Sequence, residues 1–160
     1  MTGCCCPGNV DEVSTSRCPA SGSQGTAVDL LAVKALLTEG ALRRLVPGDY
    51  RFCPDASCAV VYFSADGDRF TTADVRVPVW QKLPFGDRPI CYCFGESEAS
   101  IRSEVESNGA STAVERIRHH IDAERCACEV RNPRGACCLG DVIAAVKQVE
   151  ASVTTTRVAP

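Results

Sequence analysis

Cysteine is the residue type through which this sequence could most plainly do chemistry. The 160-residue chain contains 12 cysteines, and none occurs between positions 59 and 90. Thiolates bind metal ions, whereas disulfides are disfavoured in a reducing compartment. We therefore predict two metal sites, one from each group of cysteines. The first group is Cys4, Cys5, Cys6, Cys18, Cys53 and Cys58, and the second is Cys91, Cys93, Cys126, Cys128, Cys137 and Cys138.

The N-terminus, the apolar stretches and the charge narrow the classes of protein. Residues 1–7 lack the basic start and apolar run of a secretory signal, so we expect a cytoplasmic, reducing location. No stretch reaches the roughly 20 consecutive apolar residues that cross a bilayer. The net charge is -3 with mixed signs, which gives no basic patch for nucleic acid. No Ser/His/Asp set or phosphate-binding glycine loop indicates a classical enzyme.

In the first half, a predicted hairpin presents two thiols. Short runs rich in aromatic and β-branched residues, Tyr50 to Cys53 and Ala59 to Phe63, predict two strands joined by a turn over residues 54–57. Cys53 and Cys58 flank that turn, which brings two sulfurs toward one metal ion. Helical spacing predicts a helix from Ala32 to Leu45, although Gly40 interrupts it.

The second half is predicted to be helical, with its cysteines in loops. Ser97 is a helix cap and Gly109 a left-handed stop, so a helix should end at Asn108. Thr112 and Glu115 form a capping-box pattern for a second helix, and a third begins near Leu139. Because these first two helices should be antiparallel, the chain that follows the second helix should lie near the start of the first. Cys91 and Cys93 can then meet Cys128 and the Cys137-Cys138 pair, a geometry that favours an iron-sulfur cluster.

These patterns predict an α+β protein with two lobes. We assign residues 1–76 to a zinc-binding lobe with a β-hairpin and residues 90–151 to a helical lobe with a two-iron, two-sulfur (2Fe-2S) cluster. Residues 77–89, rich in proline and glycine, should form an extended linker. Residues 152–160 follow no pattern and should form a disordered tail.

Four segments resemble a known family. They are Tyr50 to Cys53, Cys58 to Phe63, Pro89 to Cys93, and Cys128 through Asn132-Pro133 and Gly135 to Cys137-Cys138. This pattern resembles the N-terminal domain of CopZ-type copper chaperones, whose second half is related to the bacterioferritin-associated ferredoxin domain. The resemblance covers most of the chain. It implies a 2Fe-2S cluster in the second half and a zinc ion in the first.

The resemblance also implies ligands. For the cluster it implies Cys91, Cys93, Cys128 and one of two neighbours; we choose Cys138, whose spacing to Val142 is similar to the ferredoxin pattern, and keep Cys137 as the alternative. For zinc it implies Cys18, Cys53 and Cys58. Ser21-Gly22 stands where a further cysteine is expected, so the fourth ligand should come from the Cys4-Cys5-Cys6 run. We place Cys5 there, with Cys4 and Cys6 as alternatives.

The function that the resemblance implies is metal handling by electron transfer. Single electrons would reduce Cu(II) to Cu(I). The expected partners are a copper ion or a copper-carrying protein, such as a chaperone module or transport ATPase, and a redox partner. No Cys-x-x-Cys copper loop follows Val149. Cys126 and the spare thiols near the N-terminus either bind Cu(I) transiently or stay unbound. The alternatives are a ferredoxin-like electron carrier or cluster donor without copper, and a zinc-only interaction module.

Overall fold

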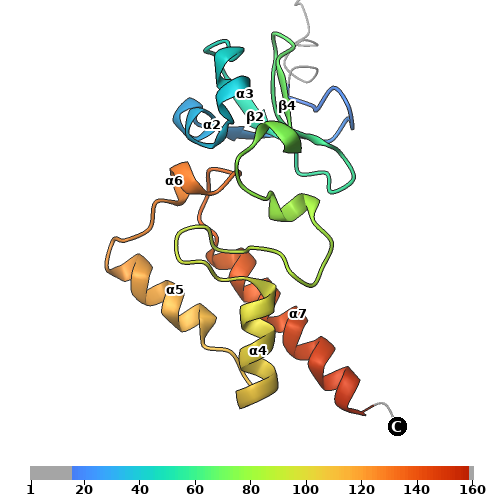
Figure 1. Cartoon of the computed structure of the whole chain (residues 1–160), viewed down its shortest axis with the longest axis vertical. Helices are drawn as coiled ribbons and strands as arrows, with labels where there is room; N and C mark the ends of the chain where they lie inside the picture. The colour runs from blue at the N-terminus through green and yellow to red at the C-terminus, as the bar shows by residue number, and fades with distance from the viewer. Residues whose placement is uncertain (1–15, 159–160) are drawn as a thin grey trace, which may run out of the picture.

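A small antiparallel sheet and a set of longer helices lie at opposite ends of the molecule. The computed structural model describes residues 16–158. In Figure 1 the strands gather with two short helices at one end, and the longer helices extend from the other. The expected α+β class is confirmed, with a sheet in strand order β1-β2-β3-β4. The elements are β1 (Thr26–Val28), α2 (Leu30–Leu36), α3 (Glu39–Arg43), β2 (Tyr50–Phe52), β3 (Val60–Ser64), β4 (Arg69–Thr71), η1 (Thr72–Asp74), η2 (Trp80–Lys82), α4 (Glu98–Asn108), α5 (Ala113–Asp122), α6 (Cys128–Arg131) and α7 (Leu139–Val158).

The predicted hairpin is confirmed as β2 and β3, and β3 is buried on both faces. Tyr62 packs in the core between sheet and helices, whereas Val60 and Phe63 pack beside Cys18 and Cys53. A register irregularity between Val60 and Tyr62 accompanies this departure from strict alternation. The sheet therefore separates a hydrophobic core from a cysteine-lined face.

The single helix predicted over Ala32 to Leu45 is wrong, because two helices occupy this region. The chain is extended at Leu37 and Thr38, and the Thr38 side chain caps α3 by accepting from the Ala41 N–H. Leu37 is buried and forms an isolated antiparallel bridge with Val75. Burial of Leu37 and the cap at Thr38 break the helix before Gly40 is reached.

The first helix of the second half follows the prediction, and the start of the next does not. Ser97 caps α4, and Gly109 ends it in the left-handed conformation at φ 83°. The capping box predicted for α5 is wrong: the Thr112 side chain makes no cap bond. Instead, the Thr112 N–H donates to the Glu104 carboxylate at 3.0 Å. A side chain from α4 thus takes the role predicted for Glu115 and joins the two helices.

The expected disordered tail is wrong for residues 152–158, which continue α7 to Val158. Val153 is buried in the helical core, so the helix gains packing beyond Val149. The hydroxyls of Thr154, Thr155 and Thr156 each donate to a carbonyl four residues earlier. These hydroxyls form their hydrogen bonds within the helix. Because the residues are polar, the sequence pattern does not indicate that they are helical.

The segment predicted as an extended linker packs against both halves and contains the turn η2. Val77 and Val79 contact the core under the sheet, and Trp80 contacts the helical core. The buried Tyr62 hydroxyl of β3 donates to the Pro133 carbonyl at 2.8 Å. Helices α2 and α6 also contact each other. Each half has its own hydrophobic cluster, but these contacts hold the two halves together. The division into residues 1–76 and 90–151 stays a prediction.

Candidate metal centres

Three sulfurs from the first half converge on one point. The Sγ atoms of Cys18, Cys53 and Cys58 all lie within 4.8 Å of one another, and those of Cys18 and Cys58 are 3.9 Å apart. Cys53 directly follows β2, Cys58 precedes β3 across the predicted turn, and Cys18 lies in the loop before β1. Three thiolates at this spacing suit a tetrahedral zinc ion, whose bonds to sulfur are about 2.3 Å long.

Hydrogen bonds and a nearby positive charge oppose the effect of burial on the thiols of Cys18 and Cys53. Burial raises the pKa of Cys18, but hydrogen bonds from Ser21 and the backbone of Ala20 outweigh burial and lower the pKa to about 7. Burial raises the pKa of Cys53, against hydrogen bonds from Ser21 and the positive charge of Lys82. The Ser21 Oγ lies 3.5 Å from Cys53 Sγ. The Lys82 ammonium donates to the Asp55 carbonyl in the hairpin turn at 2.5 Å. A serine and a lysine thus support the thiolates, as outer partners of metal ligands do.

The fourth position of this site lies outside the described residues. Among residues 16–158, only Cys18, Cys53 and Cys58 form a group of this kind. Cys4, Cys5 and Cys6 fall in residues 1–15, so the choice of Cys5 stays a prediction. Ser21 stands in the sequence where a further cysteine is expected, and its hydroxyl contact with Cys53 Sγ follows from no local pattern.

A second set of thiols gathers between the loop before α4 and the starts of α6 and α7. Cys93 Sγ lies 3.8 Å from Cys128 Sγ, while the Cys138 side chain hydrogen-bonds to Cys91 and Cys128. Cys91, Cys128 and Cys138 are buried, and Cys93 is half-buried. The four residues chosen from the sequence are therefore brought together, in a series of neighbouring contacts. That they hold a cluster stays a prediction.

Cys137 and Cys138 differ sharply in environment, although they are adjacent in sequence. Cys138 is 1% exposed, whereas Cys137 is exposed to solvent. Cys138 immediately precedes α7, and its carbonyl accepts from the Val142 N–H at 2.9 Å. This start of the helix directs the Cys138 side chain into the core and the Cys137 side chain toward solvent. The difference favours Cys138 as the ligand.

The protonation of this second set indicates a shared negative charge. The hydrogen bond with Cys138 lowers the pKa of Cys91 to about 6, and the same bond raises the pKa of Cys138. Burial raises the pKa of Cys128 to about 12. Four crowded thiols cannot all lose their protons unless a cation compensates, so this donor set fits a metal group.

Cys126 is outside both predicted sets of metal ligands. It is half-buried at the edge of the second set and hydrogen-bonds to Cys128. Burial and the nearby charges of Cys93 and Cys91 raise its pKa. Cys126 therefore borders the four-cysteine set, and its environment disfavours the thiolate.

Tyr92 and Asn132 hold the two cysteine loops. The Tyr92 hydroxyl donates to the Pro78 carbonyl at 2.6 Å and accepts from the Trp80 N–H at 3.0 Å, so it joins the Cys91-Cys93 loop to the linker. The buried Asn132 amide donates to the Ala136 carbonyl at 2.7 Å and shapes the turn before Cys138. Such partners position ligands without binding the metal themselves.

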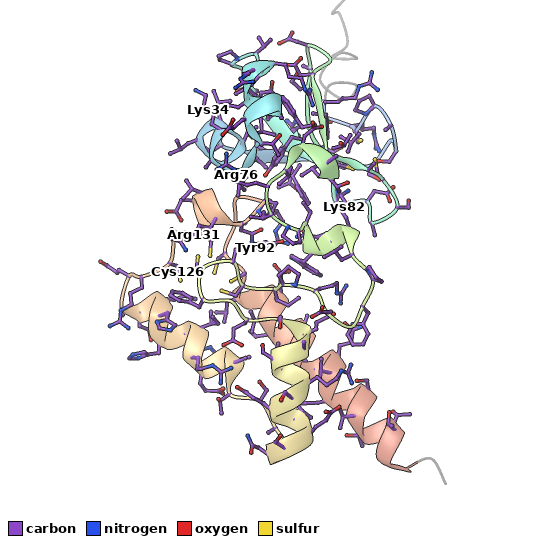
Figure 2. The ribbon with its side chains drawn as sticks, in the orientation of Figure 1. Lys34, Arg76, Lys82, Tyr92, Cys126 and Arg131 are labelled. Atoms are coloured by element: carbon purple, nitrogen blue, oxygen red, sulfur yellow. The ribbon has the colours of Figure 1, made fainter. Side chains whose placement is uncertain are left out.

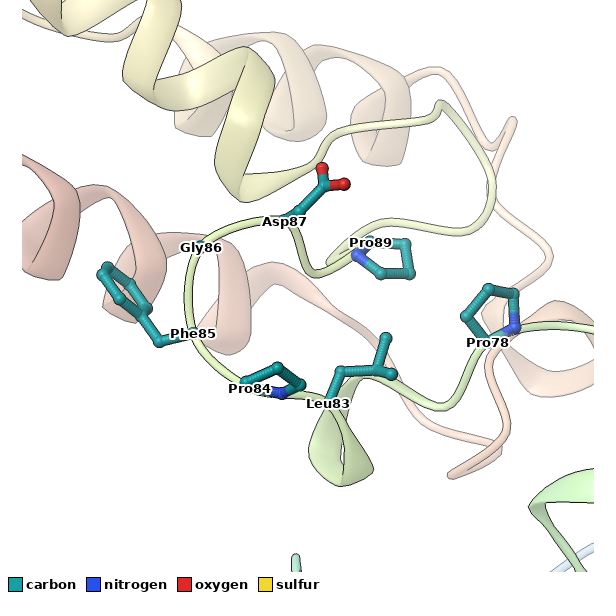
Figure 3. Close-up of a pocket in the computed structure, with 7 residues that line it drawn as sticks. All are labelled: Pro78, Leu83, Pro84, Phe85, Gly86, Asp87 and Pro89. Carbon is teal, nitrogen blue, oxygen red and sulfur yellow. The ribbon is translucent and has the colours of Figure 1, made fainter.

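The linker also encloses an apolar pocket of about 520 Å³ (Figure 3). Its wall comes from one stretch of chain: Pro78, Leu83, Pro84, Phe85, Gly86, Asp87 and Pro89. Asp87 is its sole titratable side chain. The pocket therefore presents no nucleophile and no group of metal ligands. No helix within residues 16–158 has the length and apolar character needed to cross a membrane.

Comparison with known proteins identifies the family. A family model described as a zinc binding domain matches residues 15–76. The copper chaperone CopZ of Archaeoglobus fulgidus is 34% identical over 122 residues, which cover 76% of this chain and 57% of that protein. The X-ray structure of the N-terminal domain of A. fulgidus CopZ superposes with a TM-score of 0.66 at 32% identity, covering 80% of this chain and 95% of that one. The chain spans little more than half of the curated relative, yet nearly all of its N-terminal domain; it therefore belongs to the family of the CopZ N-terminal domain.

Proposed function

We propose that this chain is a cytoplasmic zinc and iron-sulfur protein that passes single electrons in copper handling. The zinc ion would bind Cys18, Cys53 and Cys58, with Cys5 as fourth ligand and Cys4 or Cys6 as alternatives. This closed set of sulfurs leaves no open position for a substrate, so we assign the zinc a structural role. Its support is the triad within 4.8 Å that flanks the hairpin turn.

The observation that carries the proposal is the second, separate four-cysteine set. Cys93 contacts Cys128, and Cys138 contacts both Cys128 and Cys91. No three of these four sulfurs meet the mutual 4.8 Å spacing that the first triad meets. Four buried or half-buried sulfurs on a wider perimeter suit two irons better than one zinc ion. A bound 2Fe-2S cluster supplies transfer of one electron at a time.

The burial of the cysteines would determine from which side an electron acceptor reaches the second metal site. Cys138 and Cys91 are fully buried, whereas Cys93 and Cys126 are half-buried, so the site faces solvent on the Cys93 side. A copper ion arriving there as Cu(II) would leave as Cu(I) after taking one electron. Cys126 and the exposed Cys137 offer soft thiols that suit Cu(I). The named relative is a copper chaperone, which supports copper as the substrate.

Metal analysis tests the proposal first. Anaerobically purified protein should be red-brown, bleach on reduction, and contain about two irons and about one zinc per chain. The reduced protein should then convert Cu(II) to Cu(I), detected with a chelator specific for Cu(I). Cys93→Ser should abolish this activity together with the iron, whereas Cys137→Ser should keep both. Colourless zinc protein would refute the proposal. Protein that keeps its cluster but leaves Cu(II) unreduced would indicate the ferredoxin-like carrier instead.

A further inference from the structure

Three exposed cations surround the junction of the two halves on the side of the second cysteine set. They are Lys34 on α2, Arg76 after η1 and Arg131 on α6, and we call this surface the basic seam. In Figure 2 their labels follow one another from α2 down to α6, with Tyr92 beside Arg131 and Cys126 just below it. The contact between α2 and α6 and the bond from the Arg76 N–H to the Leu36 carbonyl place the three on adjoining elements.

The basic seam borders an apolar hollow of about 380 Å³. Its lining comes from both halves and from the linker: Ala35, Leu36, Val77, Tyr92, Val130 and Arg131. Tyr92 stands between Cys91 and Cys93 in the sequence, so one wall of the hollow belongs to the loop that carries two of the proposed ligands. An apolar centre with a charged rim is the usual anatomy of a protein docking surface.

The charges of the seam are not neutralised within the described part of the chain. None of the ion pairs found between residues 16 and 158 includes Lys34, Arg76 or Arg131. Arg76 donates to the Leu37 carbonyl at 2.8 Å, and Lys34 lies in the last turn of α2, so both also stabilise the end of that helix. That role does not account for Arg131, which lies on a different helix and lines the hollow.

The carboxylates close in sequence to these three cations do not form ion pairs with them: Glu39 pairs with Arg43, and Asp74 pairs with Arg44. Glu129 is on the same short helix as Arg131, but residues two apart on a helix point in nearly opposite directions. The Asp29 carboxylate accepts from the Leu31 N–H at 2.7 Å, at the other end of α2. The chain as a whole carries a net charge of -3, so a cationic surface here opposes its overall charge.

We propose that the basic seam is the docking surface for an acidic one-electron-transfer protein, which exchanges electrons with the second metal site across the Tyr92 loop. This inference rests on the proposed function, because it assumes that Cys91, Cys93, Cys128 and Cys138 hold a redox group. The partner would place carboxylates against the seam and an apolar patch over the hollow. Complementary charge raises the encounter rate and fixes orientation, and it acts most strongly at low salt.

Charge reversal tests the surface by binding, without any reaction. Oxidised flavodoxin, a small acidic redox protein, serves as the probe in calorimetric titrations at roughly 20 mM and 200 mM salt. Lys34→Glu/Arg131→Glu should weaken binding about tenfold at the lower salt, because each change replaces an attraction by a repulsion. The control Arg118→Glu/Lys147→Glu changes the net charge equally on exposed positions of α5 and α7. Equal weakening in both variants, or no salt-dependent binding by the wild type, would overturn the proposal.

Small inorganic oxidants provide a second test that does not depend on partner shape. The reduced protein is oxidised by ferricyanide, an anion, and separately by hexaammineruthenium(III), a cation. If electrons leave through the basic seam, added salt should slow the ferricyanide reaction, although the net charge of -3 alone predicts the opposite. A rate that rises with salt would refute the docking surface while leaving the proposed cluster intact. Absence of iron in the starting protein would instead refute the proposed function.

Discussion

Replacing Tyr62 by phenylalanine removes a single oxygen at the joint between the two halves. Tyr62 is fully buried on β3, and its hydroxyl donates to the Pro133 carbonyl at 2.8 Å. Pro133 lies in the turn between α6 and Cys138. The ring of Tyr62 remains in the variant, so its packing in the core is retained, and the change isolates the hydrogen bond.

The expected cost follows from what the substitution leaves behind. A buried carbonyl without a donor costs about 1–3 kcal/mol, so we expect Tyr62→Phe to lower the free energy of unfolding by about 2 kcal/mol. For a chain of this size, each kcal/mol corresponds to about 2–4 °C, which gives a fall in Tm of about 4–8 °C. The measurement is urea and thermal unfolding of the metal-loaded protein, followed by circular dichroism.

A matched control separates the joint from ordinary loss of a hydroxyl. The Tyr50 hydroxyl bonds to Asp68 and Val46 within the first half alone, so Tyr50→Phe should destabilise the sheet without loosening the turn before Cys138. Only Tyr62→Phe should also hasten iron loss to a chelator. An unchanged Tm in Tyr62→Phe, or equal iron loss in both variants, would refute the idea that this bond holds the halves together.

Three further substitutions, one of them with a matched control, test the proposed metal sites and the helical core. Cys138→Ser should remove nearly all iron while Cys137→Ser keeps about two irons per chain, and equal loss on iron analysis would contradict the assignment. Lys82→Met should speed zinc transfer to a chelator about tenfold, because the lysine bonds to the turn between two zinc ligands; an unchanged rate would count against this role. Glu98→Gln should destabilise the protein by about 3 kcal/mol at pH 7, because it unpairs the largely buried Arg88. Burial raises the pKa of Glu98, but hydrogen bonds from Arg88 lower it below its usual value, so the Tm difference should shrink as the pH falls below about 4; a pH-independent difference would be inconsistent with this pairing.

Features that depend on a few neighbouring residues were predictable from the sequence. The hairpin that carries Cys53 and Cys58 follows from two β-rich runs around one turn, and α4 from a serine cap and a glycine stop. The choice of Cys138 over Cys137 rests on the resemblance, through the spacing of Cys138 to Val142, and stays a prediction. The observed burial of Cys138 agrees with it.

Features decided by distant contacts were not predictable. Strands β1 and β4 have three residues each, too few to show a period, and exist because they pair with β2 and β3. The break at Leu37 depends on Val75, and the start of α5 depends on Glu104. The end of α7 depends on packing of Val153 against the helical core. In each case the deciding partner is remote in sequence.

The linker bonds to the loops of both proposed metal sites, which would couple them thermodynamically. Its Lys82 reaches the turn between Cys53 and Cys58, and a few residues on, the Tyr92 hydroxyl bonds to Pro78 and Trp80 of the same segment. Metal that orders the hairpin would therefore also order the approach to Cys91 and Cys93. Such coupling is reciprocal: if zinc raises the affinity of the second site for its metal group, that group raises the affinity for zinc by the same factor. In zinc-starved cells, newly made chains should consequently acquire iron poorly even when iron is plentiful.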